Sequence, residues 1–136
     1  MIPAFNDQGN LPVGIHTTTF DEFKQQFGFN VWRQTLLLNL RDLIDSASRI
    51  GGLRIVIGGS FVTNKAEPGD IDAILVVSND FDAHTPDAHI LAQAKTLFNV
   101  HLFIERERNQ ERINLWLKFF GHDRNAIPKG LVEIDL

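Results

Sequence analysis

The sequence predicts a single α+β domain. A chain of 136 residues is long enough to bury one core and too short for two ordinary domains, so residues 1–136 are expected to form one unit. Residues 31–49 carry apolar side chains at three- and four-residue spacing, which is typical of an amphipathic helix. Residues 54–57 and 71–77 are short apolar runs, which indicate buried strands. Helices and strands are therefore both expected to contribute to one core.

The first half of the chain is expected to contain two helices and one strand. The first 18 residues carry two turn signals and look irregular, so we expect them to wrap the core. Thr19, followed three residues later by Glu22, suggests a capping box for a short helix that packs three phenylalanines. The longer helix over 31–49 ends before a glycine pair, and the strand over 54–57 begins after that pair.

The second half is expected to contain two further helices and three further strands. Thr85 and Pro86 are typical of a helix N-cap and a first helical position, so a helix should run from there to about residue 98. The other segments follow from their apolar patterns: strands at 71–77, 100–104 and 131–134, and a helix near 110–120.

A glycine-rich turn follows the first core strand. Gly58, Gly59 and Ser60 come directly after the apolar run. Glycine lets the backbone turn sharply and approach an anion closely. Residues 61–65 could open a short helix, whose first N–H groups would face a triphosphate together with the Ser60 hydroxyl. An ordinary strand-to-helix turn is the alternative.

Two aspartates follow this turn after nine residues. Asp70 and Asp72 flank Ile71, so in a strand they point the same way while Ile71 enters the core. Two carboxylates on one face bind hard cations, and triphosphate chemistry often uses two Mg²⁺ ions about 3.5–4 Å apart. The aspartates could instead belong to a turn and a cap. Asp72 interrupts an apolar run, where an unpaired carboxylate is costly unless it meets a metal or a cation.

The turn and the aspartates together, IGGSFVTNKAEPGDIDAILVV, resemble the signature of the DNA polymerase beta type nucleotidyltransferase superfamily. The flanks FNDQGNLPVGIHTTTFDEF and FFGHDRNAIPKGLVEI are similar to those of a group of small bacterial nucleotidyltransferase-like proteins, so the resemblance spans most of the chain. It implies the minimal nucleotidyltransferase fold, a short mixed β-sheet covered by helices. It also implies metal-dependent transfer of a nucleotide from a nucleoside triphosphate to a hydroxyl. Mg²⁺ or Mn²⁺ would lie on Asp70 and Asp72, and the triphosphate on Gly58, Gly59 and Ser60.

The third acidic residue of the superfamily pattern is replaced in this chain. By position it would be residue 101, and His101 occupies that place. A neutral imidazole can ligate a transition metal or accept a proton from an attacking hydroxyl, but it is a poor ligand for Mg²⁺. The catalytic candidates are therefore Asp70, Asp72 and His101. Glu105 lies roughly 13 Å further along the strand, at about 3.3 Å per residue, and nothing in the sequence brings Asp135 to the site.

His101 also supports a different class of function. The fold could persist as a catalytically inactive nucleotide-binding or protein-interaction module, for example as a component of a toxin–antitoxin pair. If the protein is active, an acceptor pocket could be completed by a partner chain or by a second copy in a homodimer, because the chain has no recognisable second domain.

Three basic residues are candidates for contacts with phosphate oxygens. Lys65 lies between the two motifs, and Arg124 and Lys129 lie in the C-terminal part of the resemblance. The alternatives are that Arg124 pairs internally with a carboxylate and that Lys129 is a turn residue. A crowded set of acids and histidines matches no recognised metal-ligand spacing, and we attribute it to a polar loop and a helix cap: Asp80, Asp82, His84, Asp87 and His89.

The composition excludes several classes of site. The chain has no cysteine, which excludes disulfides, thiolate zinc sites and cysteine nucleophiles and favours an intracellular compartment. No run of roughly 18 apolar residues could span a membrane, and the first residues lack a secretory signal, so we expect a cytoplasmic protein. The net charge of −4 argues against a strong nucleic-acid binder.

Overall fold

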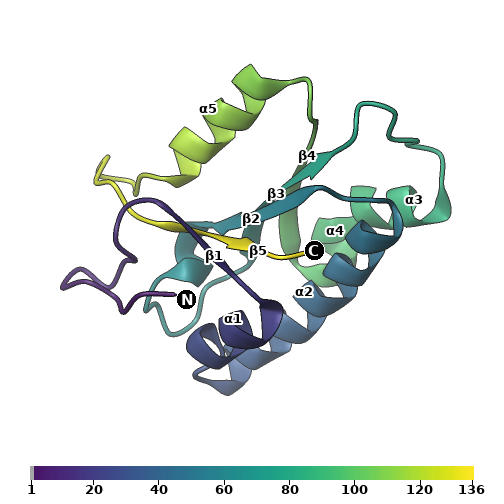
Figure 1. The fold of residues 1–136 in the computed structure, drawn as a ribbon. Coiled ribbons are helices and arrows are strands. Elements are labelled where there is room, and N and C mark those ends of the chain that lie inside the picture. Colours follow the sequence, from purple (N-terminus) through teal and green to yellow (C-terminus); the bar gives the residue numbers. More distant parts are fainter. Residues whose placement is uncertain (1) are drawn as a thin grey trace.

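The computed structural model describes residues 2–136 and contains a mixed β-sheet with helices on both faces (Figure 1). Among these residues, five strands form the sheet in the order β1-β5-β2-β3-β4. The strands are β1 (Ile15–Thr18), β2 (Arg54–Gly58), β3 (Ile71–Val77), β4 (Val100–Arg106) and β5 (Leu131–Ile134). The helices are α1 (Phe20–Phe27), α2 (Val31–Arg49), α3 (Pro86–Ala92), α4 (Ala94–Phe98) and α5 (Gln110–Phe120), together with the 3₁₀ turn η1 (Gly59–Val62).

The strand pairing makes the sheet mixed. β2 runs antiparallel to both β3 and β5, whereas β3 with β4 and β1 with β5 are parallel pairs. The predicted α+β class with a mixed sheet is confirmed. The register sets Gly58 of β2 opposite Asp72 of β3, and Asp72 opposite His101 of β4. One row across the sheet therefore contains a residue of the glycine turn, a residue of the aspartate motif, and His101.

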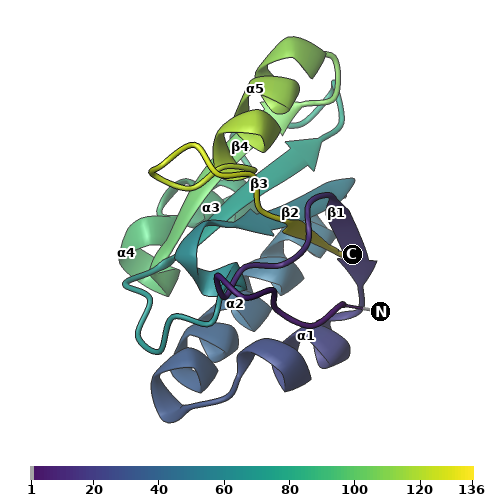
Figure 2. The ribbon, with the colours of Figure 1, turned by 90° about the vertical axis from the view of Figure 1, so that its left-hand side faces the viewer.

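The larger hydrophobic core lies on the face of the sheet that α1 to α4 cover (Figure 1, Figure 2). β2 sends Ile55 and Ile57 into this core, while Val56 between them points to the other face, as the two-residue period of a strand requires. α2 has the predicted bounds, and its Asn30 side chain caps the first turn by accepting from the Arg33 N–H. This core fixes the strands that carry the candidate site.

The opposite face of the sheet is covered by α5 (Figure 2). Its hydrophobic cluster is small and contains four buried residues: Val56, Ile74, Phe120 and Leu131. Phe103 and Trp116 pack at the margin of this cluster, with their ring centroids 4.2 Å apart. The candidate site lies beside this thinner layer.

The structure differs from the sequence prediction in several elements. β1 lies within the segment that we expected to be irregular, because the segment gains its regular structure from pairing with β5. The helix predicted from Pro86 to about residue 98 is two helices that meet at Gln93, where the backbone leaves helical geometry at φ −106° and ψ 22°. β4 continues past the predicted end at residue 104 to Arg106.

The segment before β1 packs against the core, as predicted. Ile2 and Leu11 belong to the larger core, and Asn10 forms an isolated β-bridge with Thr63 after η1. The Leu11 carbonyl accepts from the Gly130 N–H. The N-terminal segment therefore holds the glycine turn and the start of β5 together.

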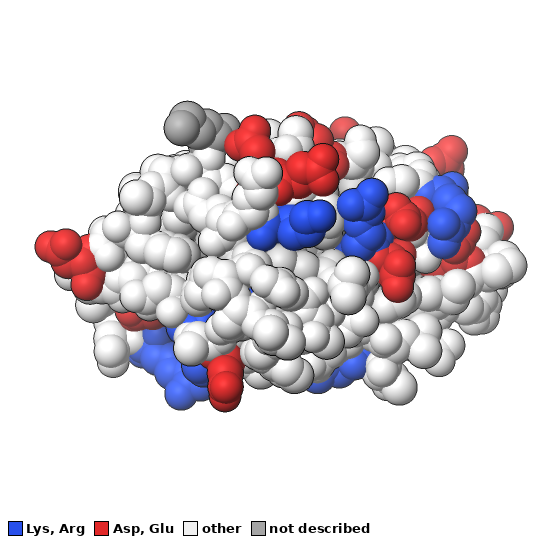
Figure 3. All heavy atoms as spheres, turned by 90° about the horizontal axis from the view of Figure 1, so that it is seen from below, with Lys and Arg blue, Asp and Glu red and all other residues white. Residues whose placement is uncertain are grey.

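The surface carries charges of both signs. The face seen from below in Figure 3 shows Lys and Arg side chains next to Asp and Glu, with a broad uncharged area between them. Some of the surface charges are paired, and the ion pair between Arg49 and Asp87 has its nitrogen and oxygen 3.0 Å apart. Within residues 2–136, no helix combines the length and the apolar character that a membrane span needs.

Candidate functional site

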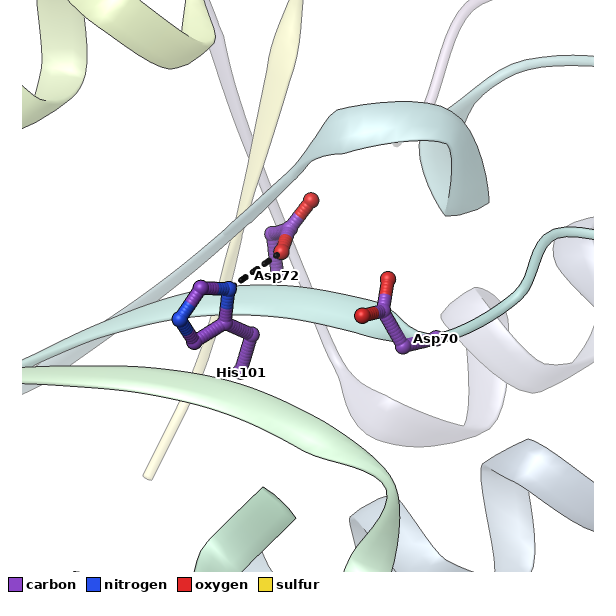
Figure 4. A group of neighbouring side chains, drawn as sticks. All are labelled: Asp70, Asp72 and His101. Carbon is purple, nitrogen blue, oxygen red and sulfur yellow. Dashed lines mark ion pairs between the residues drawn. The ribbon is translucent and has the colours of Figure 1, made fainter.

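Three side chains at neighbouring strand ends form a group that could hold a metal ion (Figure 4). Asp70 lies just before β3, Asp72 is the second residue of β3, and His101 is the second residue of β4. One ligand atom from each lies within 4.8 Å of the other two. In the described part of the chain this is the one group of three or more such residues.

The donor set is chemically suited to a divalent ion. It offers two carboxylate oxygens and one imidazole nitrogen, and the His101 ring is exposed enough to be reached from solvent. His101 Nδ1 lies 3.6 Å from an Asp72 carboxylate oxygen, so these groups already point toward each other (Figure 4). Oxygen ligands suit Mg²⁺ and Mn²⁺, and an imidazole nitrogen adds preference for a transition metal.

Asp72 is in an environment that disfavours its charge. Partial burial raises the pKa of the Asp72 carboxyl above its usual value, and the negative charge of Asp70 raises it further. The positive charges of His101, Lys95 and Lys129 act in the opposite direction but do not cancel these effects. A bound cation would remove this cost, which is a property expected of a metal ligand.

Lys95 is a site neighbour that the sequence analysis did not identify. Its ammonium donates to the Asp70 carboxylate at 2.6 Å and lies 3.4 Å from the Asn99 side-chain oxygen. The pair is exposed, so a metal ion could displace the ammonium at little cost. The helical pattern around residue 95 gave no signal of this contact, because the contact depends on how α4 packs beside β4.

The glycine turn lies directly against Asp72. Gly59 adopts a φ of +71°, and a Cβ added to it would lie 2.2 Å from an Asp72 carboxylate oxygen. The residue at this position must therefore be glycine for two reasons, the left-handed backbone and the close approach. The short helix expected at 61–65 is wrong in its bounds, because the chain forms only the 3₁₀ turn η1, which starts at Gly59.

A cleft of about 1380 Å³ brings most of the predicted site residues together. It lies between the β2–β3 region and the α5–β5 region. Seven predicted residues line it: Gly59, Ser60, Lys65, Asp70, Asp72, Arg124 and Lys129. Two predicted residues do not: Gly58 packs under Phe120, and His101 lies outside the lining, beside Asp72.

Lys129 is the most unusual of the basic residues. It is 8% exposed, and burial lowers the pKa of its ammonium although Asp123 and Asp72 favour the charge. No residue in the 2–136 range forms a hydrogen bond or an ion pair with this ammonium, yet it is not sealed from solvent. This burial distinguishes Lys129 from an exposed turn residue, and its role as a phosphate contact stays a prediction. Sequence reasoning selected the residue but not its burial, which depends on packing between the α5–β5 loop and the sheet.

The other two basic candidates are exposed. Lys65 is held through its backbone carbonyl, which accepts from the Arg33 side chain at 2.7 Å, and the residue is exposed and lines the cleft. Arg124 lies at the cleft surface, and the internal ion pair considered for it is not formed with any described residue. Both residues remain predictions as phosphate contacts.

Other acidic residues have different roles in the structure. Glu105 accepts from Arg112 at 2.7 Å and, as predicted, does not reach His101. Asp135 follows Ile134, which pairs with Ile55 at the end of β2 far from the glycine turn. In the 80–89 segment, Asp80 accepts from the Ser78 hydroxyl and Asp87 pairs with Arg49.

Comparisons with curated proteins and with solved structures find no match. The sequence model of a family of unknown function, DUF6932, matches residues 3–135. This match covers both the sheet and the candidate site. The chain therefore belongs to the DUF6932 family.

Proposed function

We propose that this protein transfers a nucleotide from a nucleoside triphosphate to a hydroxyl acceptor with the help of a divalent metal ion. The observation that carries the proposal is the group of Asp70, Asp72 and His101, which lies at the edge of a cleft that is also lined by the largely buried residue Lys129. The resemblance of the glycine turn and the aspartate motif to nucleotidyltransferases supports the same chemistry. A nucleoside triphosphate substrate is supplied by metabolism, so the proposal includes a cytoplasmic location.

The residues of the cleft have distinct roles in this proposal. Lys129 offers a charge-assisted hydrogen bond to a phosphate oxygen, and Ser60 offers a hydroxyl on the same lining. The absence of a side chain at Gly59 leaves room for the Asp72 carboxylate beside the turn, and a glycine backbone can approach the phosphates closely. Lys65 and Arg124 add positive charge at the surface of the cleft. Together these groups hold the triphosphate with its phosphates toward the carboxylates.

Asp70, Asp72 and His101 would hold Mn²⁺ or Mg²⁺. When bound, such an ion neutralises charge on the triphosphate and on the departing pyrophosphate. The oxygen of the acceptor hydroxyl forms a bond to the α-phosphorus as the bond from that phosphorus to pyrophosphate breaks, and the proton of the hydroxyl is released to solvent. The protein contributes positioning and fixed charge, which are the main sources of acceleration in this type of transfer. The acceptor could be presented by a partner chain or a second copy of this chain.

The imidazole in the donor set favours Mn²⁺ over Mg²⁺. The variant His101→Asp restores an all-oxygen set and should shift the ratio of the Mg²⁺ and Mn²⁺ dissociation constants toward Mg²⁺ by about tenfold, a typical size for a ligand-shell change. Titration calorimetry with each ion alone measures this ratio. An unchanged ratio would show that His101 is not a ligand.

Titration calorimetry with the four nucleoside triphosphates, in Mg²⁺ and then in Mn²⁺, tests the proposed site. Wild type should bind, and the double variant Asp70→Asn, Asp72→Asn should lose metal-dependent binding. The matched control is Asp42→Asn, Asp45→Asn, which removes the same charge from two exposed positions on α2. If wild type and the site variant behave alike, the proposed site is wrong.

A second candidate function is nucleotide binding without transfer. Two observations favour it: His101 takes the place of the third carboxylate in the superfamily pattern that the chain resembles, and the Lys95 ammonium pairs with the Asp70 carboxylate. Such a module would bind the triphosphate in calorimetry but release no pyrophosphate with any acceptor. Pyrophosphate release above that of the Asp70→Asn, Asp72→Asn variant would decide for the enzyme.

A further inference from the structure

The last two turns of α5 expose large apolar side chains inside the cleft. We call Leu115 and Phe119 the apolar wall. Both line the cleft, and their exposed fractions are 66% and 68%. Residues four apart on a helix lie on the same face, so the two side chains form one continuous surface. Apolar surface exposed next to polar groups in a cleft is typical of a place that a ligand covers.

The Phe119 ring has a defined orientation. It meets Phe120 at a centroid distance of 5.1 Å and Trp116 at 6.5 Å, and both interplanar angles are 85°. Phe120 is buried and Trp116 is partly buried, so these edge-to-face contacts hold an otherwise exposed ring against the packed side of α5. A fixed aromatic ring is suited to stacking against another planar ring.

The apolar wall and the glycine turn belong to the same cleft. A Cβ added to Gly58 would lie 2.8 Å from the Phe120 Cβ, so the end of α5 rests on the turn. Directly after α5, the Gly121 carbonyl accepts from the Lys129 N–H at 2.9 Å. The helix that carries the wall therefore also positions the loop that carries Lys129.

Charges around the cleft favour an anion next to the apolar wall. Four cationic side chains line the cleft, namely Lys65, Lys118, Arg124 and Lys129, against the three carboxylates Asp70, Asp72 and Asp123. A divalent ion on two of these carboxylates would make the balance more positive. A ligand that fits must have a polyanionic part for the cations and a flat apolar part for the wall.

We infer that the apolar wall binds the base of a nucleoside triphosphate, with the base stacked on Phe119. The inference rests on the proposed function and extends it by assigning the base contact to α5. Inorganic polyphosphate satisfies only the charged part of the cleft, and an apolar peptide satisfies only the wall. Since Leu115 and Phe119 offer no hydrogen-bonding group, they contact every base in a similar way, and we expect weak discrimination among the four bases.

The test compares the affinities of nucleoside triphosphates and of inorganic tripolyphosphate, each with Mn²⁺, by titration calorimetry. Phe119→Ala should weaken nucleoside triphosphate binding by about tenfold, the typical contribution of one stacked base, and leave tripolyphosphate affinity unchanged. Phe119→Tyr should keep the wild-type affinity because it keeps the ring. The matched control is Leu38→Ala. It removes a similarly exposed apolar side chain from α2, which lies on the other side of the sheet from α5, and it should change neither affinity.

Each other outcome overturns the inference in a recognisable way. If nucleoside triphosphates bind and Phe119→Ala has no effect, the base lies elsewhere while the proposed function stands. If Phe119→Ala weakens both ligands equally, Phe119 only shapes the cleft. If neither ligand binds wild type, the proposed function fails and the inference fails with it. If sedimentation shows a dimer that Phe119→Ala dissociates while nucleotide affinity is unchanged, the wall is an interface between copies.

Discussion

The two faces of the sheet differ in how completely they are covered. On one face, α1 to α4 seal a large core in which residues such as Phe23, Leu40 and Leu75 are fully buried. On the other face, α5 covers a cluster of four buried residues and leaves Leu115 and Phe119 exposed beside the cleft. The comparison teaches that the buried core and the proposed binding site lie on opposite faces. The thinner face can carry charged and exposed groups because the thicker face holds the fold.

The largest expected effect comes from equal truncations on the two faces. Leu40→Ala removes a fully buried side chain of α2 and should lower the free energy of unfolding by about 2–5 kcal/mol. Leu115→Ala removes the same atoms from an exposed position on α5 and should change it by less than about 0.5 kcal/mol. Urea unfolding followed by circular dichroism measures both. A loss at Leu115 as large as that at Leu40 would contradict the assignment of stability to one face.

Gly59→Ala should have the next largest effect on stability, because it strains the glycine turn that lies against Asp72. The variant must adopt a left-handed backbone and its Cβ must displace the Asp72 carboxylate, at a combined cost of about 1–3 kcal/mol in unfolding free energy. It should also abolish metal binding in calorimetry, since the carboxylate can no longer keep its place.

Gly51→Ala is the matched control for this variant. Gly51 has a φ of +72°, nearly that of Gly59, but a Cβ added there meets nothing within 4 Å. Gly51→Ala should therefore lower the unfolding free energy only by the backbone strain, about 1–2 kcal/mol, and keep wild-type metal affinity. Equal effects of the two variants on metal affinity would show that the contact between Gly59 and Asp72 is not what matters.

The sequence predicted the elements whose signals are local. The periodicity and the caps of α2 lie within residues 30–50, and both bounds of that helix were predicted correctly. β1 was missed because Ile15–Thr18 is short and is stabilised by pairing with β5 at the other end of the chain. The break at Gln93 was missed because nothing in the local sequence interrupts the helical pattern.

The candidate site shows the same difference between residues with local sequence signals and residues whose placement depends on long-range packing. Asp70 and Asp72 could be grouped from the strand period, and His101 was added from its position in the superfamily pattern that the chain resembles. The register of β3 with β4 makes Asp72 and His101 neighbours. The Lys95 ion pair, the burial of Lys129 and the exposure of Phe119 depend on how helices and loops pack across long stretches of chain. No spacing in the sequence encodes those contacts.

The smallest expected effect is that of Asp72→Asn. Unlike the other variants, it should raise the free energy of unfolding. Burial and the Asp70 charge raise the pKa of Asp72 in the folded protein above its ordinary value of 3.8, so ionisation of this group costs stability. Below pH 3.8 the carboxyl is protonated in both the folded and the unfolded state, and Asp72→Asn should leave stability nearly unchanged. As the pH rises through the raised pKa, wild type loses stability relative to the variant. At neutral pH without metal, Asp72→Asn should therefore be more stable by about 0.5–2 kcal/mol.

A bound metal ion should make wild type more stable than Asp72→Asn. This reversal distinguishes a carboxylate that binds metal from one that is buried without a partner. Wild type gains stability from a bound ion, by about 2.7 kcal/mol at a metal concentration one hundred times the dissociation constant, and Asp72→Asn does not. Urea unfolding at several pH values, with and without Mn²⁺, measures both signs, and the exposed Asp42→Asn on α2 should respond to neither pH nor metal differently from wild type. If Asp72→Asn stays the more stable protein even in excess Mn²⁺, the carboxylate is strained for some other reason and the thinner face does not hold a metal. If the order reverses, the stability that the metal-free protein loses by burying Asp72 is explained by a preformed metal site on the face of the sheet that α5 covers.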